Sequence, residues 1–111
     1  MVQLQDGDKM NKVFYFDIDG TITKETEGWD YKERTPRLDV IGTINKVKKD
    51  GNIVILWTSR RWIDEDITIR WLKDNNVLYD KLVMDKPRWD LYICDKSINI
   101  EQWMKHARNN M

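Results

Sequence analysis

The feature that most constrains this chain is a short hydrophobic run that ends in two acidic residues. Residues 13–16 read Val-Phe-Tyr-Phe, and the next four residues are Asp17-Ile18-Asp19-Gly20. β-branched and aromatic residues favour a buried strand, which Gly20 then interrupts. Two carboxylates at one strand tip are costly to keep together unless a metal ion or a proton transfer uses their charge. The motif therefore predicts that other parts of the chain supply partner groups.

Length and composition predict one globular domain. The chain has 111 residues, of which 41% are hydrophobic and 34% charged, so it has enough apolar side chains for one core. We expect a polar leader over residues 1–11 and a single domain over residues 12–111. Lys plus Arg and Asp plus Glu both number 19, which leaves no overall field that would attract nucleic acid or a membrane surface.

Cysteine usage and hydropathy exclude other classes of protein. Cys94 is the only cysteine and the chain has one histidine, so neither an internal disulfide framework nor a Cys/His zinc site is possible. No apolar run approaches the roughly 20 residues of a membrane-spanning helix, and the first dozen residues are too polar for a signal peptide. These patterns predict a cytoplasmic protein.

Hydrophobic periodicity predicts an alternation of strands and helices. Apolar residues at helical spacing predict a helix that begins near Pro36 and stops before Gly51, a second helix that closes at Asn75, and a last helix beyond Asn99. Continuous apolar runs predict the strands, which cover residues 12–17, 52–57, 81–84 and 91–94.

This order of elements predicts an α/β fold. Apolar strands joined through helices favour a Rossmann-like, doubly wound and mostly parallel sheet with helices on both faces, a three-layer α/β/α arrangement. In such sheets ligands bind beyond the carboxyl ends of the strands. The polar residues that directly follow the expected strands should therefore meet at one edge. They are Asp17, Asp19, Thr58, Ser59, Arg60, Lys86 and Asp95.

Such a group of side chains suits phosphoryl transfer. Asp17 and Asp95 are able to hold a hard divalent cation, and Mg2+ commonly takes one or two carboxylates together with substrate phosphate. One carboxylate can attack phosphorus, and a second one nearby can protonate the leaving group and later activate water. The expected donors to the phosphoryl oxygens are Lys86, the Thr58 hydroxyl and the backbone amides around Gly20 and Thr21.

The run Asp17-Ile18-Asp19-Gly20-Thr21 resembles the Asp-x-Asp-Gly-Thr signature of the haloacid dehalogenase (HAD) superfamily of phosphohydrolases. Thr58, Lys86 and Asp95 follow in the order of that family's later motifs. The resemblance implies an aspartyl-phosphate on Asp17, with Asp19 as the general acid/base. It also implies a Mg2+ ion held by Asp17, by the backbone carbonyl of Asp19 and by Asp95.

The resemblance also gives an interpretation of the irregular segment 22–35. A connector of this length without regular structure is usually functional. The resemblance implies that it is the flap of the family, beside the active site. The chain has no room for the large cap domain of many members, so it looks like a small capless form, in which a neighbouring copy sometimes closes the site.

One position departs from the family pattern, and one further similarity is short. The fourth motif of the family often has two adjacent acids, whereas this chain has Cys94 before Asp95. We expect Cys94 to be a small buried apolar residue, with metal binding weakened rather than lost. Thr58-Ser59-Arg60 is similar to the phosphatase domains of polynucleotide kinase-phosphatases. A phosphorylated small molecule (a sugar phosphate or a nucleotide) and a polynucleotide end are therefore both candidate substrates.

Several assignments leave alternatives open. Thr58 either contacts phosphate or starts the turn before the next helix. Arg60 either binds phosphate, with Ser59, or pairs with acids of its own helix. Lys81 is the alternative candidate for the phosphate-binding role given to Lys86. Two other functions also fit the pattern. One is a signalling receiver domain, and the other is a degenerate phosphate-binding module without turnover, which Cys94 favours.

Six tryptophans and a set of basic residues complete the candidates. Trp57, Trp71 and Trp103 occupy strand or helix-stripe positions and are expected in the core. Other tryptophans lie near the expected site, where one of them is a candidate to stack on a base or a sugar ring. They are Trp29, Trp62 and Trp89. The basic residues that could form a local rim are Arg34, Arg37, Arg60, Arg61, Lys86 and Arg88.

Overall fold

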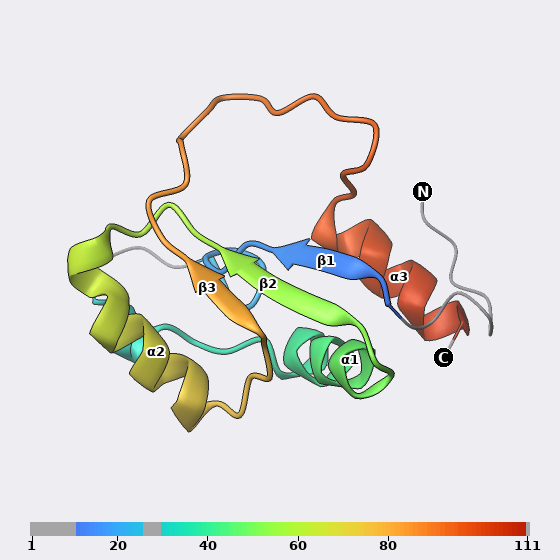
Figure 1. The fold of residues 1–111 in the computed structure, drawn as a ribbon, viewed down its shortest axis with the longest axis horizontal. Helices are drawn as coiled ribbons and strands as arrows, with labels where there is room; N and C mark the ends of the chain where they lie inside the picture. The colour runs from blue at the N-terminus through green and yellow to red at the C-terminus, as the bar shows by residue number, and fades with distance from the viewer. Residues whose placement is uncertain (1–10, 26–29, 111) are drawn as a thin grey trace.

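A computed structural model describes residues 11–25 and 30–110, which form a small parallel β-sheet flanked by α-helices (Figure 1). The strands are β1 (Val13–Phe16), β2 (Ile53–Trp57) and β3 (Lys81–Val83). The α-helices are α1 (Leu38–Lys49), α2 (Glu65–Asp74) and α3 (Ile100–Asn110), and the short 3-10 helices are η2 (Tyr31–Glu33) and η3 (Trp62–Asp64). The predicted α/β class with a parallel sheet is confirmed.

The described strands lie in the order β1-β2-β3, with β2 in the centre. Val13 pairs with Ile53 and Phe16 with Leu56, and Leu56 also pairs with Leu82 on the other side. Both pairings are parallel, so α1 and α2 serve as the crossover connections between neighbouring strands. The carboxyl ends of the strands therefore meet at one edge of the sheet (Figure 1).

Local sequence signals account for the first crossover helix. Val40, Ile41, Ile44 and Val47 form one buried stripe along α1. The helix ends at Lys49, and Gly51 then adopts a positive φ of 96°, a conformation that glycine reaches at little cost. The predicted start near Pro36 and stop before Gly51 are both confirmed to within two residues.

The hydrophobic core lies on one face of the sheet. Phe16, Val54 and Leu56 point to that face and pack in one cluster with residues from every α-helix of the described chain. Leu56 is fully buried, and burial of a side chain of this size contributes about 1.5–3 kcal/mol. Trp71 and Trp103 belong to the same cluster, as predicted, and the Trp103 ring packs edge-on against Phe16 with centroids 5.1 Å apart.

The opposite face of the sheet is less completely covered. Tyr15 is 60% exposed and Ile53 is 44% exposed, and Trp57 on the same face is half-buried rather than part of the core cluster. The prediction that β2 is covered on both faces and that Trp57 is a core residue is therefore wrong. The apolar run 53–57 shows that β2 is the central strand, but it does not show which face the helices cover.

The segment between β3 and α3 is the main departure from the predicted fold. Residues 84–99 contain no helix or strand and rise away from the sheet as an arch (Figure 1), which we call the arch. The strand predicted at 91–94 is not formed. Leu91 and Ile93 are 75% and 85% exposed, and Cys94 is exposed too, so its expected burial is also wrong. An apolar run has strand character only when a partner edge lies beside it, and the arch keeps this run apart from β1.

Two further expectations concern the ends of the chain and the flap. Of the expected leader, residues 1–10 lie outside the described residues. In the expected flap 22–35, Thr23 forms an isolated antiparallel bridge with Pro36 and η2 follows at 31–33, whereas residues 26–29 are not described. No helix in the described part of the chain combines the length and apolar character that a bilayer span requires.

Candidate functional site

The tip of β1 directs two carboxylates toward the same edge of the sheet. Between them, the Ile18 side chain is fully buried, and the Ile18 carbonyl accepts hydrogen bonds from the amides of Thr21, Ile22 and Thr23 at 3.1, 2.8 and 3.1 Å. Gly20 closes this turn with a φ of 83°, which strains any residue with a Cβ. The inward anchor at Ile18 leaves Asp17 and Asp19 on the outer side of the turn.

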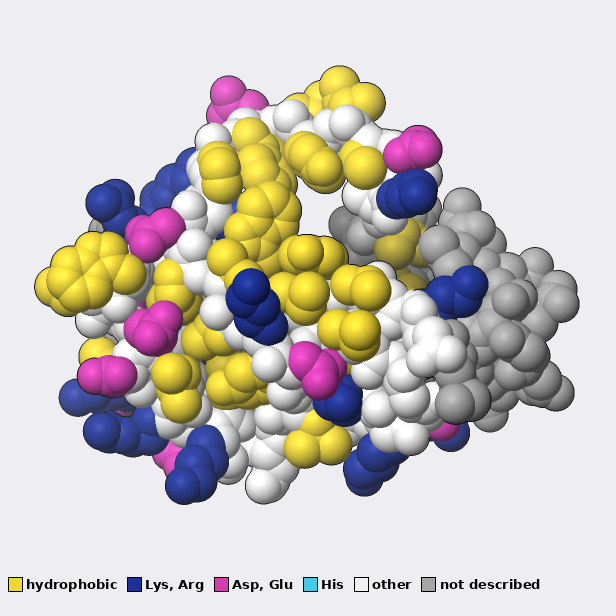
Figure 2. Space-filling model, viewed as in Figure 1, with side chains coloured by type: hydrophobic (Ala, Val, Ile, Leu, Met, Phe, Trp, Pro, Cys, Tyr) yellow, Lys and Arg dark blue, Asp and Glu magenta, His cyan; other side chains and the backbone are white. Residues whose placement is uncertain are grey.

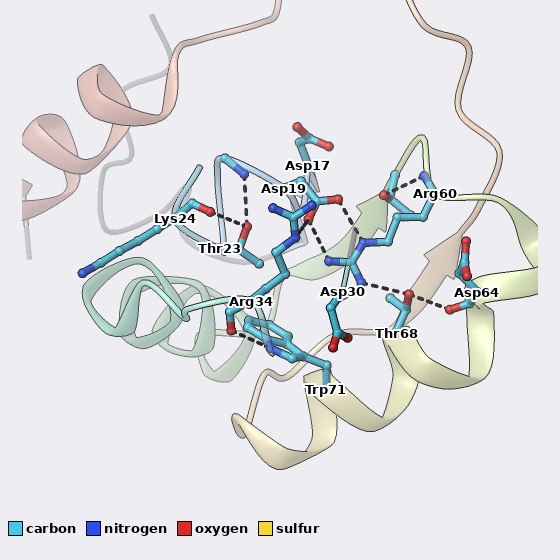
Figure 3. A network of polar contacts seen from close by, with 12 residues as sticks. Asp17, Asp19, Thr23, Lys24, Asp30, Arg34, Arg60, Asp64, Thr68 and Trp71 are labelled. Atoms are coloured by element: carbon cyan, nitrogen blue, oxygen red, sulfur yellow. Dashed lines mark hydrogen bonds and ion pairs between the residues drawn. The ribbon is translucent and has the colours of Figure 1, made fainter. Parts of the chain in front are cut away.

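Asp19 forms a two-point ion pair with Arg60, the third residue after β2. Arg60 Nη2 donates to Asp19 Oδ1 at 2.7 Å, and Arg60 Nε donates to Asp19 Oδ2 at 2.9 Å (Figure 3). This parallel geometry is the strongest arrangement that a guanidinium makes with a carboxylate. It fixes the rotation of the Asp19 side chain, whose exposed fraction is 34%.

Arg60 is itself held from two further sides. Its side chain is only 1% exposed, and Nη1 donates to Thr68 Oγ1 on α2 at 3.1 Å. The Thr68 hydroxyl in turn donates to the Asp64 carbonyl at 2.8 Å. The ring of Tyr31 in η2 lies 3.9 Å from Arg60 Cζ, a cation–π contact. Arg60 therefore connects Asp19 to α2 and to η2.

A second arginine, which directly follows η2, also approaches Asp19. Arg34 Nε lies 3.7 Å from Asp19 Oδ1, and the Arg34 carbonyl accepts a hydrogen bond from Trp71 Nε1 at 2.9 Å (Figure 3). Arg34 also packs over the Tyr31 ring at 5.4 Å. The core residue Trp71 thus anchors the end of η2, where the chain passes the site.

Asp17 is paired with Lys86, as the predicted site requires. Lys86 Nζ lies 3.0 Å from Asp17 Oδ1, although 69 residues separate them in the chain. The Lys86 amide donates to the Thr58 carbonyl at 2.8 Å, which holds the start of the arch against the end of β2. Lys81, the rival candidate, lies at the first residue of β3, the end that faces away from this edge. Of the two lysines, Lys86 is therefore the one that lies beside Asp17.

Three of the other predicted phosphate-binding groups form hydrogen bonds within their own loops in this arrangement. Thr58 is 1% exposed, and its hydroxyl accepts from the Arg60 amide at 3.1 Å, which is the turn-forming interpretation of this residue. The Gly20 amide donates to Thr23 Oγ1 at 3.2 Å and the Thr21 amide donates to the Ile18 carbonyl. Ser59 is half-buried in the same loop. These groups shape the two loops that present Asp17 and Asp19.

Asp95, the third expected metal ligand, lies on the arch. Within residues 11–25 and 30–110, no group of three or more His, Cys, Asp or Glu side chains gathers in a way that could hold a metal ion. Asp17 and Asp19 still fit Mg2+ in donor chemistry, because this ion commonly uses one or two protein carboxylates and takes its other ligands from water and substrate. The Asp17 side chain is 43% exposed and therefore reachable from solvent.

Cys94 and its neighbours form a local cluster on the arch. The Cys94 sulfur accepts from the Lys96 amide at 3.3 Å and lies 3.8 Å from Asp95 Oδ1. A hydrogen bond with Cys94 is the main cause that raises the pKa of Tyr92 above its ordinary value of 10.0, with nearby negative charge and desolvation adding to it. Among the described residues, no hydrogen bond or ion pair links this cluster to Asp17 or Asp19.

The described contacts give the site more positive than negative charge. Asp17 and Asp19 face the cationic groups of Lys86, Arg60 and Arg34. Such an excess favours a bound anion, for which phosphate is a natural candidate. Sequence reasoning placed Arg34 only in a general basic rim and gave no role to Tyr31 or Thr68. Nothing in the local pattern signals these two, because their contacts with Arg60 are tertiary.

Two of the site-edge tryptophans are placed by the structure. Trp89 on the arch is 43% exposed, and Lys86 Nζ lies 5.4 Å from its ring. Trp62 in η3 is 69% exposed and is the most open of the described tryptophans. Trp29 lies outside the described residues.

Comparison with solved structures shows the fold. The chain superposes on the crystal structure of a protein target from Vibrio cholerae with a TM-score of 0.75 and 23% sequence identity, over 90% of this chain and 99% of that one. It also superposes, with a TM-score of 0.59, on a chain of a Pnkp1/Rnl/Hen1 complex, at 23% identity over 86% of this chain.

A second structure, that of the Pnkp1/Rnl/Hen1 RNA repair complex, gives the same TM-score of 0.59 at 19% identity over 99% of this chain. This chain spans 34% of the matched chain in each of the two complexes. No protein-family model matches the chain. No curated protein matches it either.

Proposed function

We propose that this protein is a Mg2+-dependent phosphomonoester hydrolase of the HAD superfamily. One observation carries the proposal: Asp17 and Asp19 lie at the carboxyl end of β1, and each is paired with a cation that follows a later strand of the same sheet. Lys86 follows β3 and Arg60 follows β2. This is the edge of a parallel sheet where ligands bind. The Asp-x-Asp-Gly-Thr motif and the fold of the solved neighbours support the same assignment.

In the first half of the proposed reaction Asp17 is the nucleophile. One Asp17 carboxylate oxygen attacks phosphorus, the new O–P bond forms, and the bond from phosphorus to the leaving oxygen breaks. The leaving oxygen takes the electron pair and receives a proton from Asp19. Lys86, whose Nζ is 3.0 Å from Asp17 Oδ1, balances the charge that the phosphoryl group brings beside the carboxylate.

In the second half the aspartyl-phosphate on Asp17 is hydrolysed. Asp19, now ionised, takes a proton from a water molecule, whose oxygen attacks phosphorus. The bond between Asp17 and phosphorus breaks and inorganic phosphate leaves. Both oxygens of Asp19 accept from Arg60, and each keeps a further lone pair for the proton. In this proposal Arg60 is a positioning residue for Asp19 rather than a direct phosphate ligand.

We include Mg2+ in the proposal because its expected ligands are carboxylate and carbonyl oxygens, which this ion prefers. Asp17 and the backbone carbonyl of Asp19 would hold it at the tip of β1. The family pattern adds Asp95, which lies on the arch and belongs to no metal-binding group among the described residues. When bound, it would neutralise phosphoryl oxygens and the Asp17 carboxylate, so that two anions can approach one another.

The proposed substrate is a phosphorylated small molecule, either a sugar phosphate or a nucleotide, or a polynucleotide end. One of the solved structures with the same fold is a chain of the Pnkp1/Rnl/Hen1 RNA repair complex, which favours the polynucleotide end. Neutral net charge predicts a small footprint on such a strand, because phosphate contacts supply most non-specific affinity.

The test is hydrolysis of a generic phosphomonoester by the purified chain in the presence of Mg2+. We expect phosphate release by the unmodified protein and only background release by Asp17→Asn, with an unchanged unfolding midpoint. The matched control is Asp90→Asn on the arch, which should leave the rate unchanged. Full activity of Asp17→Asn would overturn the mechanism.

A non-catalytic phosphate-binding module is the second candidate. The observation that favours it is the full engagement of Asp19 by Arg60, together with the position of Cys94 and Asp95 on the arch. Such a module would bind inorganic phosphate, and would release none from any monoester in the same assay. A stable phosphorylated form without turnover would instead indicate a receiver domain.

A further inference from the structure

Four aromatic side chains form a continuous row from the open face of the sheet onto the arch. Tyr15 meets Trp57 edge-on with ring centroids 6.0 Å apart, and Trp57 lies 6.1 Å from Trp89. Trp89 then stacks on Tyr92, with centroids 4.8 Å apart and planes inclined by 29°. We call these residues, Tyr15, Trp57, Trp89 and Tyr92, the aromatic row.

The aromatic row is separate from the hydrophobic core. None of its members belongs to the core cluster, and Tyr15, Trp89 and Tyr92 are 60%, 43% and 51% exposed. Figure 2 shows hydrophobic side chains gathered over the open face of the sheet and continuing along the arch. Large rings left open to solvent in a contiguous patch mark an interaction surface.

The centre of the aromatic row is separated from Asp17 by one side chain, that of Lys86. Lys86 Nζ is 3.0 Å from Asp17 Oδ1 and lies 5.5 Å from the Trp57 ring and 5.4 Å from the Trp89 ring. The same ammonium group therefore forms a hydrogen bond with the proposed nucleophile and lies within cation–π distance of the two central rings of the row. Lys86 thus places Trp57 and Trp89 beside the position that a phosphoryl group on Asp17 would occupy.

We propose that the aromatic row binds the terminal nucleobases of a single-stranded polynucleotide whose phosphorylated end lies at Asp17. Every nucleobase has a flat face that stacks on indole and phenol rings, so the row would bind strands without a sequence preference. The row spans several ring widths, which suits successive bases of a strand better than one isolated ring. This inference rests on the proposed function only for the position of the phosphate.

The surrounding charges agree with this ligand. Arg88 is exposed and precedes Trp89 directly, and Arg61 is exposed and pairs with Asp85 at the start of the arch. Basic side chains beside stacking rings are the usual combination in single-strand binding surfaces. The short row and the few cations predict contact with only a few nucleotides.

The experiment compares two ligands that differ only in their bases. One is a short single-stranded oligonucleotide with a terminal phosphate, tested with the phosphate at its 3′ or its 5′ end. The other has the same backbone and terminal phosphate, but its last nucleotides are abasic. We expect the unmodified protein to favour the base-bearing strand by about tenfold to hundredfold in kcat/KM, because stacking contributes this much per base.

Substitutions identify the rings responsible. Trp89→Ala should reduce the ratio between the two ligands to near one, and Trp89→Phe should restore most of it. The matched control is Trp62→Ala, an exposed tryptophan of η3 outside the row, which should keep the ratio. An unchanged ratio in Trp89→Ala would overturn the inference. If the ratio is unchanged but this variant has a different oligomeric mass, the aromatic row instead binds a second copy of the chain.

Binding to Asp17→Asn separates this inference from the proposed function. The same two strands are titrated into this variant while intrinsic tryptophan fluorescence is measured. If neither strand is hydrolysed by the unmodified protein but base-dependent quenching persists and is lost with Trp89→Ala, the proposed function fails and the aromatic row stands. If both strands are hydrolysed equally well and quenching does not depend on the bases, the row fails and the phosphatase stands.

Discussion

Arg60 and Asp19, which are 41 residues apart in the chain, form a bidentate ion pair with N–O distances of 2.7 and 2.9 Å at the edge of the sheet. Arg60 is almost fully buried, whereas Asp19 is partly open to solvent. Because Arg60 is buried in the protein, the ion pair holds the partly exposed Asp19 carboxylate in a fixed position. A residue assigned to proton transfer benefits from such a fixed position, because acid–base help depends on geometry first.

Arg60→Lys should separate the charge of this residue from its geometry. Lysine keeps the positive charge but has neither the second parallel hydrogen bond nor the planar contact with Tyr31. We expect a loss of about 1–3 kcal/mol in the free energy of unfolding and at least a tenfold loss in kcat. Urea unfolding and steady-state kinetics measure both. Arg61→Lys, with a side chain 73% exposed, is the control and should change stability by less than about 0.5 kcal/mol.

Thr68→Val tests how much the hydrogen bond from Arg60 to the Thr68 hydroxyl contributes to the stability of the fold. Valine has the shape of threonine but leaves Arg60 Nη1 and the Asp64 carbonyl without the Thr68 hydroxyl. An unmet buried donor costs about 1–3 kcal/mol, so the urea midpoint should fall by a corresponding amount. Thr68→Ser keeps the hydroxyl and should lose much less. Equal stability of the valine and threonine forms would contradict the role of this hydrogen bond.

Asp80 should make the stability of the fold depend on pH in the acid range. The Val54 amide donates to its carboxylate at 2.8 Å and Lys48 pairs with it at 3.1 Å, which together lower the pKa of Asp80 below its ordinary value of 3.8. The stabilisation is therefore fully present above that ordinary value and is lost as the pH falls through the lowered one. Denaturant titrations from about pH 6 down to about pH 2.5 should show a smaller acid loss in Asp80→Asn. Asp90→Asn, another exposed aspartate, should follow the unmodified protein.

Removal of divalent cations should abolish turnover. With EDTA we expect background phosphate release, and added Mg2+ should restore the rate. Asp95→Asn should raise the Mg2+ concentration that gives half-maximal activity, and Cys94→Asp should lower it, because a second acid beside Asp95 adds a hard oxygen donor. Persistent turnover in EDTA would exclude the metal from the proposed reaction, and an unchanged Mg2+ requirement in Asp95→Asn would exclude Asp95 as its ligand.

The parts of the site that were predictable from the sequence are those set by local structure. Val13 to Phe16 and Gly20 define a strand and its turn within eight residues, so the placement of Asp17 and Asp19 follows from short-range rules. Lys86 could be predicted because a parallel sheet brings successive strand ends to one edge, where the structure indeed pairs it with Asp17. The length of the flap pointed to function without giving its contacts.

The parts that were not predictable depend on tertiary contacts. Arg60 had two candidate roles, phosphate binding or pairing within its own helix, and the structure pairs it with Asp19 instead. That pairing follows from how the β2 loop faces the β1 loop, which no pattern in either loop specifies. The run Leu91 to Cys94 has strand composition, but composition does not tell whether a neighbouring edge lies within reach.

The parallel pairing of β1 with β2 has a consequence for the order in which the chain is made and folded. Val13 pairs with Ile53, which lies about forty residues later in the chain, so this ladder contact cannot form until Ile53 has been synthesised. The core face of β1 is completed later still, when Trp103 of α3 covers Phe16. The strand that presents the two carboxylates is thus synthesised before its partners and sealed by the last helix. During translation, the apolar face of β1 therefore stays exposed to solvent until α3 has been synthesised.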